Sequence, residues 1–270
     1  MRPGNPDSPI GVFDSGVGGL SILRALRAEL PGEDFVYFSD AGHAPYGERG
    51  DAFVAQRSVD IARGLVDGHG IKALVVACNT ATAAAVHLLR EAHGHALPVV
   101  GVEPALRPAA ALTRTRRVAV FATRGTLASA KFRALHGALA AQAEFLLQPC
   151  DGLAAAIESH DDTEVAALCE RYARACGAFG CGDGQIDTLV LGCTHYPFAL
   201  AHLTAAVGAD VHLLETGVPV ARQARRLLED RGLRNAGGGA TVTLRTTGSP
   251  QTLHAAAERW LGLQAEAVAA

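Results

Sequence analysis

Lysine is almost absent from this chain. Among its 24 lysine and arginine residues, only Lys72 and Lys131 are lysines. An enzyme that works with pyridoxal phosphate holds the cofactor through a lysine Schiff base, so only these two side chains could serve that chemistry. A strong excess of positive charge is also missing, because the formal net charge is −3. A domain that binds nucleic-acid phosphates is usually strongly basic, so nucleic acid is not an expected partner.

Long apolar runs are missing as well. The apolar segments are interrupted by Arg, Asp, His or Gly before they reach the roughly 20 residues that a membrane helix needs, so no membrane partner is expected. The segment from Met1 to Pro9 contains three prolines and no apolar core, which is not the pattern of a signal peptide. We therefore expect a cytoplasmic protein whose six cysteines remain thiols.

The chain alternates short apolar segments of strand type with longer segments of helical period. Its 270 residues, 49% hydrophobic and 19% charged, suffice for one large globular domain or two small ones and argue against disorder. The first strands are predicted at 10–13, 35–38, 73–77 and 99–102, and the helices between them at 20–30, 52–66 and 80–93. This alternation predicts an α/β fold whose parallel sheet is covered on both faces.

The same order then restarts. Val118–Phe121 resembles Ile10–Phe13, 108 positions earlier, and Leu189–Thr194 resembles Leu74–Asn79, 115 positions earlier. Two matches in one order predict a duplicated α/β unit. The later part of the chain is predicted to contain a helix at 154–176, loops at 177–184 and 236–239, strands at 211–214 and 241–245, and a last helix at 251–261.

Two cysteines occupy equivalent places in the two halves. Cys78 and Cys193 each follow a predicted strand and precede polar residues at the start of a helix. Ligands of parallel sheets bind at the carboxyl ends of strands, where helix N-termini attract carboxylates and favour thiolates. A single cysteine is more often a small buried apolar residue, but a repeated pair favours a functional site. The other four cysteines, Cys150, Cys169, Cys176 and Cys181, have no C-x-x-C spacing, so we expect structural thiols and no metal site.

Polar side chains surround these cysteines. His195, two residues after Cys193, could orient the thiol, accept its proton or stabilise its thiolate. Asp14 and Ser15 follow the first strand, although Asp14 could equally be a helix N-cap. Tyr46 and Gly47 follow Pro45 in a loop that could also be an ordinary turn.

A dinucleotide site is not expected. The fingerprint G-x-G-x-x-G would use Gly16 and Gly18, but its third glycine is replaced by Ser21. The basic run Arg114, Arg116 and Arg117 is predicted to be a solvated loop before a strand.

Four segments together resemble the signature segments of the bacterial glutamate racemases. They are Gly11–Leu20, Pro45–Gly47, Ala77–Ala81 and Leu191–Pro197. The region from Thr246 to Gly262 is also similar, so the likeness extends from about Pro9 to Gly262. The two cysteine segments are the most specific part of it.

The resemblance implies an amino-acid racemase that needs no cofactor. The family fold has two pseudo-symmetric α/β domains with the active site between them, which predicts residues 1–102 and 215–270 for the first domain and 103–214 for the second. The implied substrate is glutamate, and the implied pathway is peptidoglycan synthesis, which uses D-glutamate. A homodimer is compatible with this family, and oligomeric state is not readable from the sequence.

The resemblance also implies roles for individual residues. By position, the acid/base cysteines are Cys78, acting on D-glutamate, and Cys193, acting on L-glutamate, with Asp14 and His195 as their helpers. The implied substrate-binding residues are Asp14, Ser15, Tyr46, Gly47, Asn79, Thr80, Thr194 and His195. Glu158 corresponds to a supporting carboxylate of the second half.

The sequence departs from the family pattern at two places. Ser129 replaces a threonine of the G-T-x-x-T segment, and Glu215 stands where an aspartate is expected. Two other classes remain open from the residues themselves. One is a thiol hydrolase or decarboxylase that pairs one cysteine with His195, which leaves the other cysteine unexplained. The other is a carboxylate-binding regulatory protein on the same duplicated scaffold.

Overall fold

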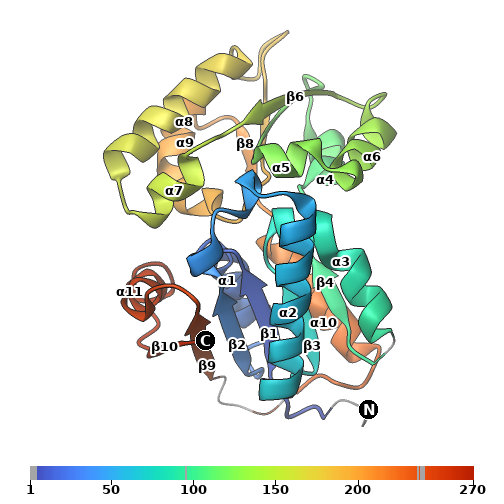
Figure 1. Cartoon of the computed structure of the whole chain (residues 1–270). Helices are drawn as coiled ribbons and strands as arrows, with labels where there is room; N and C mark the ends of the chain where they lie inside the picture. The colour runs from blue at the N-terminus through green and yellow to red at the C-terminus, as the bar shows by residue number, and fades with distance from the viewer. Residues whose placement is uncertain (1–4, 95, 236, 238–240) are drawn as a thin grey trace. The chain divides into compact units, whose positions relative to one another are not determined.

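The structure, a computed structural model, describes residues 5–94, 96–235, 237 and 241–270 (Figure 1). The chain divides into two compact units. Unit 1 comprises the chain up to Val102 and from Gly217 onward, and unit 2 comprises Glu103–Thr216. The boundary expected after residue 214 falls after Thr216 in this division. The predicted α/β class with parallel sheets is confirmed in both units.

The sheet of unit 1 is parallel throughout, in the order β10-β9-β2-β1-β3-β4. Its strands are β1 (Ile10–Asp14), β2 (Phe35–Ser39), β3 (Ala73–Val76), β4 (Val99–Gly101), β9 (Val242–Thr246) and β10 (Ala267–Ala269). Every residue of β1 is buried, which explains why its sequence is apolar up to the terminal Asp14. Asp14 pairs with Ser39 and Phe13 with Val76, so the carboxyl ends of the central strands meet at one edge.

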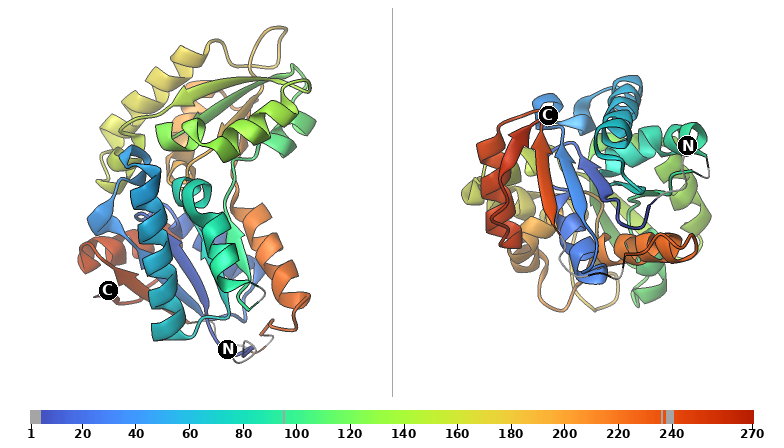
Figure 2. Two further views of the ribbon diagram at one scale, coloured as in Figure 1. Left: turned by 45° about the vertical axis from the view of Figure 1, so that its right-hand side comes forward. Right: turned by 90° about the horizontal axis from the view of Figure 1, so that it is seen from below.

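Helices cover both faces of this sheet (Figure 2). They are α1 (Leu20–Glu29), α2 (Asp51–His69), α3 (Asn79–His93), α10 (Gly217–Glu229) and α11 (Pro250–Leu261), with short 3-10 helices η1 (Ala41–His43) and η2 (Tyr46–Glu48) between β2 and α2. On one face α2 packs against α3, and on the other α1 packs against α10. The apolar stripe Val54, Ile61 and Leu65 of α2 recurs at helical spacing and contacts the sheet residues Phe13 and Val76 in one core.

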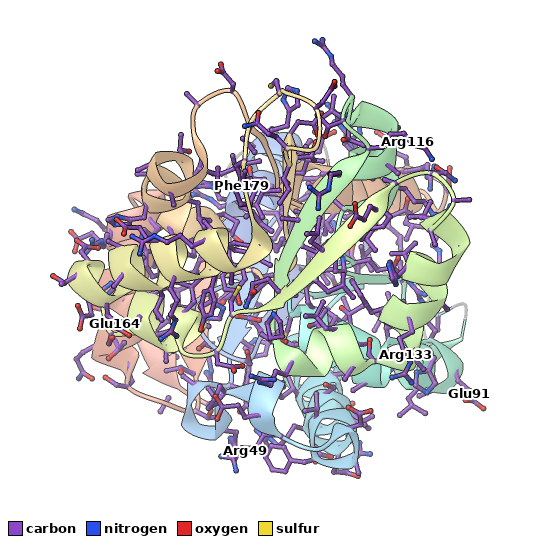
Figure 3. The ribbon with its side chains drawn as sticks, turned by 90° about the horizontal axis from the view of Figure 1, so that it is seen from above. Arg49, Glu91, Arg116, Arg133, Glu164 and Phe179 are labelled. Carbon is purple, nitrogen blue, oxygen red and sulfur yellow. The ribbon has the colours of Figure 1, made fainter. Side chains whose placement is uncertain are left out.

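Unit 2 repeats this arrangement on a smaller scale. Its strands are β5 (Arg117–Ala122), β6 (Glu144–Pro149), β7 (Thr188–Leu191) and β8 (His212–Leu214), and its helices are α4 (Leu106–Leu112), α5 (Arg124–Ala128), α6 (Ala130–Leu139), α7 (Leu153–Glu158), α8 (Asp162–Cys176), η3 (Tyr196–Ala199) and α9 (Leu200–Val207). In Figure 3, Glu164 marks α8 and Arg133 marks α6, on opposite sides of β5 and β6. Val118 and Val120 of β5 face the α4–α6 side, whereas Phe121 meets Tyr172 of α8.

The strand orders β2-β1-β3-β4 and β6-β5-β7-β8 are equivalent, and both are parallel. The matched sequence segments lie on equivalent strands, since β1 corresponds to β5 and β3 to β7. The predicted duplication of an α/β unit is therefore visible in the topology.

Several local predictions are corrected by the structure. The helix expected at 154–176 is two helices, because His160 adopts a left-handed φ of 57° and Asp161 caps α8 through Glu164 N, 3.0 Å away. Strands β6 and β10 were not expected. Of the loop expected at 236–239, only Gly237 lies within the described residues.

The arginine run, predicted to be a solvated loop, is a loop only in part, because Arg117 is the first residue of β5. Arg116 donates to the carbonyls of Ala141 and Gln142, and Arg117 pairs with Glu144 at 2.9 Å. These contacts fasten the start of β5 to the start of β6.

Each of the two lysines forms an ion pair with a glutamate. Lys72, directly before β3, is buried and forms an ion pair with Glu33 at the amino end of the strands. Lys131, in the first turn of α6, pairs with Glu103 at 2.7 Å.

Candidate active site

In unit 1, Cys78 sits at the junction between β3 and α3. It is the N-cap of α3, where its Sγ accepts a hydrogen bond from Ala81 N at 3.4 Å. The same thiol lies 3.7 Å from the hydroxyl of Ser15, which follows β1. Cys78 is buried, and the N-terminus of α3 provides N–H groups and a positive dipole end that favour a thiolate there.

Asp14 is held by the turn that follows it. Its Oδ2 accepts hydrogen bonds from the backbone N–H of Gly16 at 3.3 Å and of Gly19 at 2.9 Å. A Cβ at Gly19 would lie 2.6 Å from the Asp14 Cβ, so the turn needs glycine there. The N-cap of α1 is Gly19, so the alternative that Asp14 is this cap is wrong. The carboxylate nevertheless lies at the helix start, at the same sheet edge as Cys78.

Asn79 and Thr80 form the first turn of α3, and both are buried. Within the described part of the chain, neither Oδ1 nor Nδ2 of Asn79 has a hydrogen-bond partner. A buried amide without partners costs about 1–3 kcal/mol, so its retention beside Cys78 is typical of a ligand-binding position.

The 3-10 helix η2 brings Tyr46 to the same region. Tyr46 is buried, packs in one apolar core with Cys78, and donates its hydroxyl to Asp40 Oδ2 at 2.5 Å. Burial, and then this hydrogen bond to Asp40, hold the pKa of Tyr46 far above its usual range, so the phenol stays protonated. Gly47 follows in η2, which packs against α3.

In unit 2, Cys193 follows β7 as Cys78 follows β3. Cys193 Sγ lies 3.6 Å from Nδ1 of His195, and Nε2 of His195 lies 2.7 Å from Oε1 of Glu158 at the end of α7. Burial of His195 opposes its protonation, but the hydrogen bonds to Cys193 and Glu158 outweigh burial and raise the pKa of His195 well above its usual value. Thr194, between the cysteine and the histidine, is also buried.

The departures from the family pattern have clear positions. Ser129 caps α6 by accepting from Phe132 N at 3.1 Å and donates to Thr126 O at 2.8 Å. Its hydroxyl is thus used at the α5–α6 junction. Glu215 is exposed, directly after β8.

All six cysteines are thiols without disulfides. Burial raises the pKa of Cys169 to about 12 and that of Cys176 to about 11, and it raises the pKa of Cys150 further. Such thiols are unreactive at neutral pH, as expected of structural cysteines.

In the part of the chain that the structure describes, no group of three or more His, Cys, Asp or Glu side chains is placed to hold a metal ion. Among the same residues no helix is long and apolar enough to cross a bilayer.

Comparison with known proteins identifies the family. The sequence profile of one family, described as Asp/Glu/hydantoin racemase, matches residues 11–224. The chain belongs to the Asp/Glu/hydantoin racemase family. A glutamate racemase of Pseudomonas paraeruginosa is 46% identical over 248 residues, which cover 91% of each chain. The resemblance to glutamate racemases drawn from the sequence, and the prediction of an amino-acid racemase, are confirmed.

Solved racemase structures have the same fold. A glutamate racemase isoform from Bacillus anthracis matches with a TM-score of 0.86 and 32% identity, covering 98% of both chains. The Escherichia coli glutamate racemase, solved in complex with L-glutamate and the activator UDP-MurNAc-ala, matches with a TM-score of 0.84 and 29% identity over 97% of both chains. For this racemase family member, the two-domain α/β prediction is thereby confirmed.

One group of residues escaped the sequence analysis. Asp40 follows β2, as Asp14 ends β1, and it gathers hydrogen bonds from Tyr46, Arg57 and Thr247. A carboxylate at a strand end was the available signal, because the same reasoning selected Asp14. Thr247 could not be found that way, since it lies 207 positions from Asp40.

Proposed function

We propose that this racemase interconverts L- and D-glutamate by proton transfer at Cα between two thiols, Cys78 and Cys193, with no added cofactor. The observation that carries the proposal is the repeated placement of one cysteine after β3 and one after β7, each leading into a polar turn. The glutamate substrate is supported by the curated glutamate racemase to which the chain is 46% identical over 91% of both lengths.

The chemistry follows from the stereochemistry of the substrate. Racemisation removes the Cα proton from one face and returns a proton to the other face. One thiolate accepts the proton and leaves a carbanion at Cα, and the thiol of the other cysteine then donates its own proton to the opposite face. The pair of sulfurs exchanges protonation states in each turnover, and the reverse reaction exchanges their roles. In this proposal Cys78 deprotonates D-glutamate and Cys193 deprotonates L-glutamate.

The two thiols have different helpers. The Cys193 thiol faces His195, whose raised pKa and contact with Glu158 favour an imidazolium that stabilises the neighbouring thiolate. Cys78 instead has the N-terminus of α3 and the hydroxyl of Ser15. Asp14, at the same edge, supplies a negative charge near the start of α1. This carboxylate can bind the substrate ammonium group or accept a proton from Cys78.

Glutamate is a very weak acid at Cα, so the site must also stabilise the carbanionic transition state. We assign the substrate carboxylates to the Asn79 amide, which has no partner among the described residues, and to the buried turns that contain Thr80 and Thr194. Preorganised donors of this kind act without reorganisation at the moment of proton transfer.

We further propose that the product D-glutamate serves peptidoglycan synthesis in the cytoplasm. The Escherichia coli neighbour was solved with UDP-MurNAc-ala as its activator, and the resemblance to glutamate racemases points to the same pathway. A homodimer remains a prediction from the resemblance.

Racemisation of dialysed protein in D₂O tests the proposal. With two separate acid/base groups, the product enantiomer carries deuterium at Cα, while the remaining substrate keeps its protium early in the reaction. The expected result is such racemisation of glutamate from both directions, with aspartate as the comparison substrate. Racemisation of aspartate or a hydantoin without glutamate turnover would contradict the substrate. Hydrolase activity that survives loss of Cys78, or glutamate binding without turnover, would support the other two classes.

A further inference from the structure

A fully buried carboxylate, Asp40, precedes residues 41–48, called the substrate loop because they contain Tyr46 and Gly47. Asp40 contacts both this loop and the turn after β9. Its Oδ2 accepts the hydroxyl of Tyr46 at 2.5 Å and Nε of Arg57 at 3.0 Å. Its Oδ1 accepts Nη2 of Arg57 at 2.6 Å and the hydroxyl of Thr247 at 2.9 Å, and lies 3.0 Å from Nδ1 of His43. Four side chains thus converge on one carboxylate.

Asp40 is ionised in this setting. Its burial opposes the charge, but the hydrogen bonds from Arg57, Tyr46 and Thr247 together lower the pKa of Asp40 below its ordinary value. When a buried carboxylate loses one of its hydrogen bonds, its charge is left poorly compensated, which destabilises the arrangement of side chains around it.

Thr247 belongs to the turn after β9. This Thr246–Gly248 segment is part of the resemblance to the racemase family, but the resemblance assigned it no role. Its hydroxyl donates to Asp40 and also accepts the backbone N–H of Gly42 at 3.1 Å. A Cβ at Gly42 would lie only 2.6 Å from the carbonyl oxygen of Thr247, so η1 is in direct backbone contact with this turn. Thr247 therefore binds the start of the loop through Gly42, and Asp40 binds the end of the loop through Tyr46.

The chemistry of Tyr46 shows what this loop can offer a substrate. Its only O–H group is donated to Asp40, and its ring is buried in the core that contains Cys78. The phenol therefore has no O–H group left to donate to a substrate. The part of the Tyr46–Gly47 pair that can bind a substrate is its backbone, and backbone groups bind well only when the loop conformation is fixed.

We propose that Asp40 and Thr247 are positioning residues of the racemase, which hold the Tyr46–Gly47 loop in the conformation that binds the substrate. The inference rests on the proposed function, since that function assigns Tyr46 and Gly47 to the substrate. Neither positioning residue contacts the reacting atoms. When the loop populates its binding conformation only in part, the apparent affinity falls by that fraction, whereas the chemical step of the bound complex is unchanged.

The test compares Thr247→Val with Thr247→Ser. Valine keeps the branched volume and removes the hydroxyl, whereas serine keeps the hydroxyl. Thr113→Val is the matched control, because the Thr113 hydroxyl donates at 2.5 Å to another buried carboxylate, Asp187, which belongs to unit 2. Hydrogen exchange of the backbone amides at 41–48 is measured beside the steady-state kinetics, so that loop order is read without turnover.

The expected result is a KM for both glutamate enantiomers that rises about tenfold in Thr247→Val, with little change in kcat and with faster amide exchange at 41–48. Thr247→Ser stays close to wild type, and Thr113→Val changes neither KM nor loop exchange. Unchanged loop exchange in Thr247→Val overturns the positioning role. Faster exchange with an unchanged KM overturns the link to substrate binding. A wild-type protein that does not racemise glutamate contradicts the proposed function instead, and loop exchange still decides whether Thr247 orders the loop.

Discussion

His195 Nε2 lies 2.7 Å from Oε1 of Glu158, and the other ring nitrogen of His195 faces the Cys193 thiol. Glu158 ends α7 and His195 follows β7, so the contact joins two elements of unit 2 that are 37 positions apart. The histidine is buried, so the carboxylate is a main source of compensation for its positive charge.

Glu158→Gln should weaken the reaction that starts from L-glutamate. The neutral amide can hydrogen-bond to the ring but cannot compensate the imidazolium, so the pKa of His195 falls and the thiolate of Cys193 is less stabilised. We expect kcat from L-glutamate to drop about 10- to 100-fold. The alkaline limb of its pH–rate profile should also move to lower pH.

Both directions are measured by following optical rotation across pH. Glu164→Gln, an exposed residue in the first turn of α8, is the control and should behave as wild type. The equilibrium constant between the enantiomers cannot change, so kcat/KM must fall by the same factor in both directions. An unchanged pH–rate profile in Glu158→Gln would show that the carboxylate does not act through His195.

Single serine substitutions at Cys78 and Cys193 should each abolish racemisation. A serine hydroxyl is a far weaker acid than a thiol, which has an ordinary pKa of about 8.5. Each variant retains one thiol, so Cα–H abstraction is expected to survive for one enantiomer, D-glutamate in Cys193→Ser and L-glutamate in Cys78→Ser.

Elimination from a glutamate analogue with a β leaving group reads out this half-reaction. Cys169→Ser, a buried structural thiol on α8, is the control and should keep full racemisation. Full racemisation in either Cys78→Ser or Cys193→Ser would refute the proposed two-thiol mechanism.

The strands that precede the two cysteines could be predicted because each is a short, buried and mostly apolar segment. β1, β3, β5 and β7 lie at the centres of their sheets, so nearly all their side chains are apolar and turn residues mark their ends. β6 was missed because it is an edge strand with exposed Glu144 and half-buried Gln148, which blur the apolar pattern. The break between α7 and α8 was missed because the left-handed residue there is His160 rather than glycine.

The candidate site was predictable only where its residues adjoin a strand end. Cys78, Asp14 and Cys193 each follow or end a central strand, so the topology alone assigns them to the carboxyl edges. The contacts of Asp40 depend on tertiary packing, since Thr247 reaches it from a turn 207 positions away. No local pattern in the sequence encodes that pairing.

Asn79→Ala should separate stability from function. The buried Asn79 amide makes no hydrogen bond within the described residues, so its removal relieves a desolvation cost. We expect the free energy of unfolding to rise by up to about 1 kcal/mol, while the KM for glutamate rises about tenfold or more.

Urea unfolding and steady-state kinetics measure the two effects. Thr82→Val on the same helix provides the contrast, because the Thr82 hydroxyl donates to Val76 O at 3.2 Å and accepts from Val102 N at 3.0 Å. Loss of this satisfied pair should destabilise the protein. If Asn79→Ala were destabilising and left KM unchanged, the amide would have a structural role and no role in substrate binding.

Asp187 should make the stability of the protein depend on pH in the acid range. The buried carboxylate accepts from the Thr113 hydroxyl at 2.5 Å and from the backbone N–H groups of Arg114 and Thr115 at 2.7 and 3.1 Å. Burial alone would raise its pKa, but these hydrogen bonds lower the pKa of Asp187 to about 2. A carboxyl group whose pKa is lower in the folded than in the unfolded state stabilises the fold above the unfolded value of about 3.9, and this stabilisation disappears as the pH falls toward 2.

Asp187→Asn removes this contribution and leaves donors facing an amide. At pH 7 the free energy of unfolding should fall by about 2–3 kcal/mol, and the gap to wild type should narrow by about 1 kcal/mol between pH 5 and pH 3. Urea unfolding followed by circular dichroism at several pH values measures both quantities.

Asp183→Asn, on the exposed loop before β7, is the control and should stay within about 0.5 kcal/mol of wild type throughout. Asp187 lies at the amino end of β7, away from the strand end that carries Cys193, so the racemisation rate of folded Asp187→Asn at pH 7 should equal that of wild type. A gap that stays constant from pH 7 to pH 3 would mean that Asp187 stabilises the turn through its shape and hydrogen bonds, without a contribution from its charge.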